Sequence, residues 1–252
     1  MAQQDVKNII KQEYVKCVSD PVYFMKKYCW IQHPTRGRIQ FNLFPFQEGV
    51  LNLLNKNDRS IILKSRQLGI STLSAGIALH MMLFQKDKAI LVVATKQDTA
   101  KNLVTKVKFM YDGLPSWLKL GFVENNKLAL RLKNGSQIKA VSAASDAGRS
   151  EAISLLIIDE AAFIEENRIE EIWGSSQQTL ATGGKSIILS TPNGTGNFFH
   201  RMWIKAEEGT NGFTPIKLPW TVHPERNQIW RDKQNDELGL RMAAQECDCD
   251  FT

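Results

Sequence analysis

This chain lacks long hydrophobic runs. No stretch of its 252 residues approaches the about 18 consecutive apolar positions that a membrane-spanning helix requires. The N-terminal segment MAQQDVKNIIKQEY alternates charged with apolar residues and lacks the apolar core of a signal peptide. We therefore expect a cytoplasmic protein that makes no contact with a membrane.

Cysteine is also scarce, and its pattern excludes the usual cysteine-based sites. The four cysteines form no Cys-x-x-Cys pair, and no histidine stands at metal-binding spacing beside them. We expect reduced, buried thiols and no structural zinc. The cysteines are Cys17, Cys29, Cys247 and Cys249.

The composition is that of a globular protein with a basic surface. Hydrophobic residues make up 43% and charged residues 23% of the chain, which is the usual balance for a folded domain. The length suits one large domain, alone or with a small appendage. The formal net charge of +6 favours a polyanionic partner such as nucleic acid, although many basic proteins bind none.

Short apolar runs alternate with longer helical segments from about residue 60. The runs are continuous, as in strands that are covered on both faces, and they span 61–63, 89–94, 153–158 and 186–189. Such alternation predicts an α/β fold with a mainly parallel sheet flanked by helices. Segment 121–142 contains hairpin turn signals, Asn125-Asn126 and Asn134-Gly135, and predicts an antiparallel extension at the sheet edge.

The two ends of the chain have different patterns. Residues 1–30 predict helices, with Asp20 as an N-cap and Pro21 in a first turn. Residues 33–45 predict a loop with a short strand. After residue 212 we expect a short strand and two helices, the first near Pro224 and the second over about 236–246. We thus divide the chain into a core at 1–212, including the N-terminal helices, and a small lid subdomain at 213–252.

The central feature is the segment 61–72, in which an apolar strand leads through a small-residue turn into a helix. This geometry directs backbone N–H groups and a helix N-terminus at an anion. Gly69 would let the backbone approach phosphates, and the hydroxyl of Ser71, or of its neighbour Thr72, would bind Mg²⁺. The residues expected to contact a nucleotide here are Ser65, Gln67, Leu68, Gly69, Ile70, Ser71 and Thr72.

This loop departs from the standard pattern GxxxxGK[ST]. Lys64 occupies the place of the first glycine, and Ile70 occupies the place of the phosphate-binding lysine. Two cations remain in the loop, Lys64 and Arg66. We favour Lys64 as the replacement and keep Arg66 as the alternative. A plain strand-turn-helix corner, without a ligand, is the competing interpretation of the segment.

A second buried strand ends in two adjacent carboxylates. Asp159 stands where it can hold Mg²⁺ opposite Ser71, and Glu160 stands where it can polarise the attacking water. The competing interpretation is that the pair only caps the short helix at 161–164. The phosphate loop and the acidic pair together favour a nucleotide hydrolase.

Four further residues are candidates for the same site. Ser190 and Thr191 end another buried strand and could sense the γ-phosphate, although an ordinary Pro-Asn-Gly turn follows. Arg149 could stabilise transition-state charge in its own subunit or in a neighbour's, or be a solvated surface arginine. The amide of Gln47 could pair with adenine, or lie on a helix surface.

Together these segments resemble the large terminase subunit of tailed bacteriophages of the myovirus type. The resemblance extends from about residue 40 onward and includes Phe198-Phe199 and Trp203. It rests on Phe-Pro-Phe-Gln47, Ser65-Arg-Gln-Leu-Gly-Ile-Ser-Thr72, Leu156-Ile-Ile-Asp-Glu-Ala-Ala-Phe163 and Ser190-Thr-Pro-Asn-Gly194.

The resemblance implies a P-loop ATPase core of the RecA and helicase kind, which uses ATP and Mg²⁺ to move double-stranded DNA into a procapsid. It implies a portal protein and a small terminase subunit as partners, in the host cytoplasm, with a homo-oligomeric ring during packaging and a monomer in isolation. It assigns adenine contact to Gln47, Mg²⁺ binding to Asp159 and catalysis to Glu160. The coupling motif falls on Ser190-Thr191, and a trans-acting arginine on Arg149.

Large terminases also carry a C-terminal nuclease domain. The chain stops at Thr252, about where that domain would begin, so we expect an excised motor domain without nuclease activity. Two other functions compete with DNA packaging. One is a nucleic-acid translocase or helicase-type ATPase of another family, and the other is a nucleotide-binding assembly module with little turnover.

Overall fold

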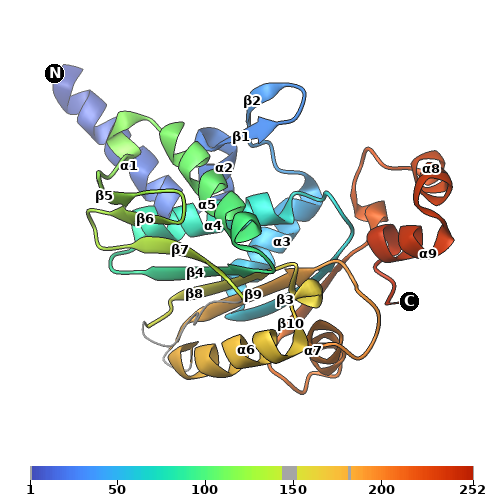
Figure 1. Ribbon diagram of the computed structural model, residues 1–252. Coiled ribbons are helices and arrows are strands. Elements are labelled where there is room, and N and C mark those ends of the chain that lie inside the picture. Colours follow the sequence, from blue (N-terminus) through green and yellow to red (C-terminus); the bar gives the residue numbers. More distant parts are fainter. Residues whose placement is uncertain (1, 144–151, 181–182, 252) are drawn as a thin grey trace.

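A single eight-stranded sheet organises the molecule (Figure 1). The computed structural model describes residues 2–143, 152–180 and 183–251. Six strands are parallel, and two antiparallel strands, β6 (Ala129–Leu132) and β5 (Phe122–Asn125), extend one edge. In spatial order the parallel strands are β10 (Thr214–Leu218), β3 (Arg59–Lys64), β9 (Lys185–Ser190), β8 (Leu155–Asp159), β4 (Ala89–Ala94) and β7 (Gln137–Ser142).

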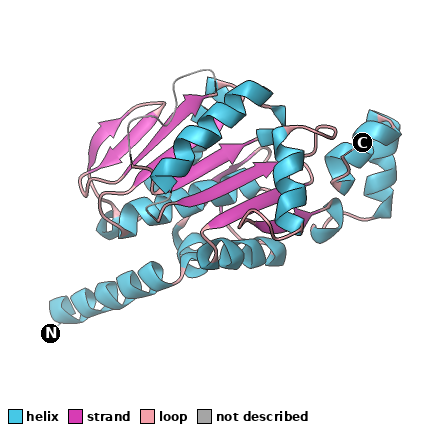
Figure 2. Ribbon diagram, turned by 90° about the horizontal axis from the view of Figure 1, so that it is seen from below, coloured by secondary structure: helices cyan, strands magenta, loops and turns pink. Residues whose placement is uncertain are grey.

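The continuous apolar runs become strands because both faces of the sheet are covered. Successive side chains point to opposite faces, so Ile62 belongs to one hydrophobic core while Ile61 and Leu63 belong to the other. The helices on the first face are α2 (Pro21–Tyr28), α3 (Pro45–Lys56), α4 (Ile70–Phe84) and α5 (Gln97–Asp112). The opposite face is covered by α6 (Glu166–Leu180) and α7 (Phe198–Glu207), as Figures 1 and 2 show. The predicted α/β class and the antiparallel edge are confirmed.

The N-terminal segment forms helices as predicted, and a hairpin follows them. Helix α1 (Ala2–Ser19) extends away from the sheet, and α2 begins after Asp20, whose side chain accepts a hydrogen bond from Tyr23 N. The expected loop with one strand is a two-stranded hairpin instead, β1 (Trp30–His33) and β2 (Gly37–Gln40). Strand β2 begins directly after the turn with Gly37 at a φ of 67°, a backbone conformation that glycine adopts readily.

The boundary placed at residue 212 has to move. Thr214–Leu218 is strand β10, which pairs in parallel with β3 as part of the central sheet, so the chain leaves the sheet only after Leu218. Beyond it, α8 (Gln228–Leu238) and α9 (Leu240–Ala243) lie beside the carboxyl ends of the strands (Figure 1). The helix expected over 236–246 is interrupted at Gly239, whose φ of 79° ends α8. We call residues 219–251 the lid segment.

The remaining sequence-based expectations concern cysteines and membranes. All four cysteines are buried free thiols, as predicted. Among the described residues, no helix combines the length and the apolar character needed to cross a bilayer.

Candidate active site

The phosphate loop joins the end of β3 to the start of α4. Gly69 precedes the helix with a φ of 73°, in the left-handed region that side chains other than glycine's disfavour. A Cβ atom at Gly69 would lie 2.7 Å from Nε2 of Gln47. The first backbone N–H groups of α4 have no intrahelical acceptor. They therefore form an anion-binding end of the kind that the sequence predicts.

Gln47 braces this loop from the first turn of α3. Its Nε2 donates to Leu68 O at 2.9 Å, and its Oε1 accepts from Phe44 N at 3.0 Å. The side chain is only 4% exposed. The predicted contact between Gln47 and adenine therefore stays a prediction, while the structure gives the amide a bracing role.

The loop's first residue meets the acidic pair. Lys64, 6% exposed, places its Nζ 3.4 Å from Oε1 of Glu160. The strands that carry them, β3 and β8, are separated in the sheet by β9, so the long lysine side chain spans the gap. A buried cation thus stands beside the expected general base, although Ile70, at the usual lysine position, is packed in the core at 1% exposure.

The environment of Glu160 raises the pKa of its carboxyl group. Burial is the main cause, and the neighbouring Asp159 adds to it, while Lys64 acts in the opposite direction. Glu160 also has a φ of 55°, a strained conformation of the kind that clusters at functional sites. The backbone N–H of Glu160 donates to Oδ1 of Asp159 at 3.0 Å. This hydrogen bond orients the carboxylate of Asp159.

The end of β9 holds the segment that follows the acidic pair. Ser190, fully buried, accepts at Oγ a hydrogen bond of 3.1 Å from Ala162 N. Asn193 donates from Nδ2 to Ala162 O, also at 3.1 Å. Thr191 is buried beside Ser190 at 3% exposure. The predicted sensor strand is therefore tied directly to the loop that carries Glu160.

The lid segment is hydrogen-bonded to the phosphate loop. Arg226 donates to Ser65 Oγ at 3.1 Å and to the carbonyl oxygens of Arg66 and Gln67 at 2.9 and 3.3 Å. The Glu246 carbonyl accepts from Arg66 N at 2.8 Å and from Ser65 Oγ at 3.1 Å.

The two candidate cations, Lys64 and Arg66, have different partners. The Arg66 side chain is exposed and its Nε lies 3.7 Å from Oε2 of Glu246, whereas Lys64 faces Glu160. Sequence reasoning missed Arg226 and Glu246, because nothing in the pattern around them differs from a solvated loop and helix.

The expected metal ligands suit a cation that is completed by phosphates. Among the described residues, no three His, Cys, Asp or Glu side chains gather into a metal site. Mg²⁺, however, is usually bound by one or two protein oxygens together with substrate phosphates and waters. Asp159, 6% exposed, and Ser71, in the first turn of α4, supply oxygens of that type.

The structure thus gathers most of the predicted site at the carboxyl ends of β3, β9 and β8, where ligands bind in open α/β sheets. Thr72, also in the first turn of α4, lines a cavity between α4 and α5. Arg149 lies outside the described residues.

Comparisons with known proteins agree with this geometry. The family model described as terminase large subunit, T4likevirus-type, N-terminal, matches residues 61–246. The large terminase ATPase domain of Thermus phage P74-26 aligns with a TM-score of 0.63 at 21% identity, covering 81% of this chain and 93% of that one. The HK97 bacteriophage large terminase aligns with a TM-score of 0.67 at 17% identity, covering 90% of this chain and 47% of that one.

A third solved structure carries a nucleotide. It is the large terminase of a thermophilic bacteriophage in complex with ATP-gamma-S, with a TM-score of 0.66 at 10% identity and coverage of 84% of this chain and 53% of that one. At such low identities the three likenesses establish the fold alone. The chain spans about half the length of the HK97 and thermophilic-phage proteins.

Proposed function

Because the chain belongs to the T4likevirus-type large terminase family, we propose that it hydrolyses ATP and thereby drives double-stranded DNA into a procapsid. The observation that carries the proposal is the 3.4 Å contact between Lys64 and Glu160. It brings the phosphate loop and the acidic pair together across β9, and hydrolysis of a bound triphosphate needs both groups at one site.

In this proposal each side chain has one task. Glu160 orients the attacking water and accepts its proton. Lys64 leaves Glu160 when ATP binds and turns to the phosphate oxygens, in place of the lysine that Ile70 replaces. Asp159 and Ser71 hold Mg²⁺, which neutralises phosphate charge when bound. Ser190, through Ala162, links the occupancy of the site to the end of β9.

The proposed partners follow from the family. They are double-stranded DNA, a portal protein, a small terminase subunit and further copies of this chain in a ring. The net charge of +6 supports a DNA partner, because cationic side chains that neutralise phosphates supply most non-specific DNA affinity.

The test compares the parent with Glu160→Ala and with Glu165→Ala as a matched control. Glu165 is exposed in the same segment, and its side chain contacts none of the described residues through a hydrogen bond or ion pair. We expect Glu160→Ala to bind Mg-ATP at least as tightly as the parent, because Lys64 no longer has to leave Glu160. It should lose at least ~10²-fold in turnover, since general base catalysis contributes about that much. Glu165→Ala should hydrolyse ATP like the parent. Equal and negligible turnover in all three proteins would show an inert nucleotide-binding module instead.

Translocation needs a separate assay. With procapsids, portal and small subunit, the protein should protect DNA from added nuclease in an ATP-dependent manner. The Glu160→Ala form should protect none. Unwinding of duplex DNA without encapsidation would favour a helicase.

A further inference from the structure

Arg226 of the lid segment contacts the phosphate loop through neutral acceptors. Its guanidinium donates to Ser65 Oγ at 3.1 Å and to the carbonyl oxygens of Arg66 and Gln67 at 2.9 and 3.3 Å. Among the described residues, no carboxylate forms an ion pair with it, and burial lowers the pKa of the guanidinium group. A half-buried cation without a counter-ion therefore lies against the loop.

The two carbonyl contacts fix the direction of backbone N–H groups. In a trans peptide, the carbonyl oxygen of one residue and the N–H of the next point to opposite sides, and no described peptide bond is cis. Arg226 holds two such oxygens, those of Arg66 and Gln67. The N–H groups of Gln67 and Leu68 therefore point away from the guanidinium. Gln47 acts alike on the next peptide, since its Nε2 donates to Leu68 O at 2.9 Å.

These N–H groups are available to an anion. Among the described residues, none accepts a hydrogen bond from the backbone N–H of residues 67–69. Gln67 has a φ of 58° and Gly69 a φ of 73°, and turns of this kind gather successive N–H groups into a concave anion site. A left-handed φ is unfavourable for a residue with a side chain, so the surroundings must hold Gln67 in it. Arg226, which binds the Gln67 carbonyl, does so.

We propose that Arg226 is a positioning residue for the triphosphate. It keeps the N–H groups of the loop directed at the phosphate oxygens, and its hydrogen bonds to the carbonyl groups polarise the same peptides. Its uncompensated charge adds to that of Lys64, in a loop where Ile70 supplies none. This inference rests on the proposed function and adds a residue of the lid segment to those that prepare the phosphate site.

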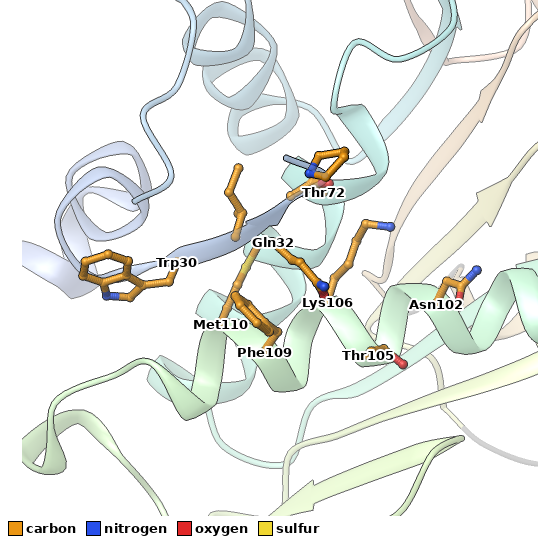
Figure 3. Close-up of a pocket in the computed structure, with 10 residues that line it drawn as sticks. Trp30, Gln32, Thr72, Asn102, Thr105, Lys106, Phe109 and Met110 are labelled. Atoms are coloured by element: carbon orange, nitrogen blue, oxygen red, sulfur yellow. The ribbon is translucent and has the colours of Figure 1, made fainter. Parts of the chain in front are cut away.

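The first turn of α4 also borders a cavity of about 390 Å³ (Figure 3). The residues that line it belong to β1 and the turn after it, to α4 and to α5, and include Thr72, Lys106 and Phe109. Among the described residues, none of the lid segment lines this cavity. Truncation of Arg226 therefore leaves these walls unchanged, and a change in phosphate binding reports on the loop.

Calorimetric titration with Mg-tripolyphosphate tests the proposal, because this ligand has three phosphates and no base. Arg226→Ala removes both the hydrogen bonds and the charge, whereas Arg226→Lys keeps the charge without the planar fork. The control is Arg241→Ala, at an exposed position on α9 without a described partner. We expect Arg226→Ala to weaken tripolyphosphate and Mg-ATP alike, ~10-fold or more, the scale of one lost hydrogen bond to a charged group. Arg226→Lys should lie between Arg226→Ala and the parent, and the control should match the parent.

Two further readouts separate positioning from a general loss of structure. In ATP hydrolysis, Arg226→Ala should raise KM ~10-fold while kcat changes by less than about threefold, because Arg226 makes no contact with the acidic pair. Guanidinium chloride at low millimolar concentration should restore part of the tripolyphosphate affinity of Arg226→Ala, relative to the same concentration of sodium chloride. It should leave Arg241→Ala unchanged. Melting temperatures establish that each variant is folded.

The outcomes are distinct. Parental tripolyphosphate affinity in folded Arg226→Ala overturns the positioning role and leaves the ATPase proposal standing. A loss of kcat at parental affinity also overturns it. If Arg226→Ala unfolds, Arg226→Lys decides, because one ammonium group cannot hold three acceptors as a planar fork does, and parental affinity in that variant overturns the proposal. A parent that binds neither tripolyphosphate nor ATP contradicts the proposed function itself.

Discussion

At the scale of single residues, the contact between Lys64 and Glu160 suits a phosphate loop that lacks the usual lysine. Ile70 supplies no charge, so the proposed function needs a cation from another position. Lys64 is buried and close to the acidic pair, whereas Arg66 is exposed and paired with Glu246 in the lid segment. The Nζ atom beside Glu160 also offsets part of the cost of ionising a half-buried carboxylate.

This pairing predicts how activity depends on pH. Burial raises the pKa of Glu160 and Lys64 lowers it, so Lys64→Met should raise that pKa further. Glu160 accepts a proton only when ionised, hence kcat/KM falls as the pH falls through its free-enzyme pKa. We expect the acid limb of kcat/KM to begin above the ordinary carboxylate range in the parent. In Lys64→Met it should lie at still higher pH.

The control for the pH profile is Lys56→Met, an exposed lysine on α3 without a described side-chain partner. All three proteins are assayed in the same Mg-ATP buffers, so the titration of the nucleotide is common to them. An acid limb at the same pH in the parent and in Lys64→Met would show that the two side chains do not interact in solution.

Gly69 allows a clean test of the loop's backbone. Gly69→Ala introduces a Cβ at a left-handed φ, which costs about 1–2 kcal/mol, and places it 2.7 Å from Nε2 of Gln47. We expect the free energy of unfolding in urea to fall by at least about that amount. Gly49→Ala is the matched control, because Gly49 is exposed in α3 with open space around it. It should gain about 0.5–1 kcal/mol. Equal changes in both would mean that the loop relaxes freely.

At the scale of elements, β9 connects the two halves of the candidate site. It lies between the strand of the phosphate loop and the strand of the acidic pair. Its end is bound to the segment after Glu160 by Ser190 and Asn193, both through Ala162. We expect any shift of Glu160 to reach β9 through these hydrogen bonds.

The lid segment is the second element that is bound to the site through hydrogen bonds. Arg226 makes three hydrogen bonds to the phosphate loop and stacks on Trp230 at 4.4 Å. Arg226→Ala should loosen the lid, because each lost charged hydrogen bond costs roughly 1.5–3 kcal/mol. Amide hydrogen exchange in residues 219–251 and in the loop should accelerate ~10-fold or more. Arg241→Ala, at an exposed position on α9 without a described partner, should leave exchange unchanged. If Arg226→Ala exchanges amide hydrogens at the parental rate, the hydrogen bonds of Arg226 do not hold the lid segment to the phosphate loop.

The elements also show what a single sequence encodes. The runs at 61–63 and 186–189 predicted their strands correctly, because burial on both faces leaves a continuous apolar signature. Their spatial order did not follow, since periodicity reports burial and not the identity of a neighbour. The hydrogen bonds by which Gln47 and Arg226 hold the phosphate loop could not be predicted from the sequence either. Their partners are main-chain carbonyl oxygens 21 and 160 residues away, and a carbonyl has no sequence signature.

At the scale of the whole molecule, the predicted catalytic arginine can come from the same subunit or from a neighbouring one. Arg149 belongs to the segment between β7 and β8 and lies outside the described residues. Among the described residues, Lys64 lies beside Glu160 at the expected triphosphate site. Arg226 of the lid segment already donates hydrogen bonds to carbonyl oxygens of the phosphate loop. An arginine that stabilises developing charge on the phosphates adds typically 10³–10⁵-fold, roughly, to turnover. Assembly into a ring is one way to supply it.

This leads to a complementation test of subunit cooperation. We propose that Arg149 acts in the active site of a neighbouring copy, so the specific ATPase activity of the parent should rise with protein concentration. Arg149→Ala and Glu160→Ala should each be inactive alone. Their mixture should regain activity, because a Glu160→Ala subunit keeps the arginine that completes the intact site of an Arg149→Ala neighbour. A mixture as inactive as its components, together with a concentration-independent parent, would place Arg149 in its own active site or outside catalysis.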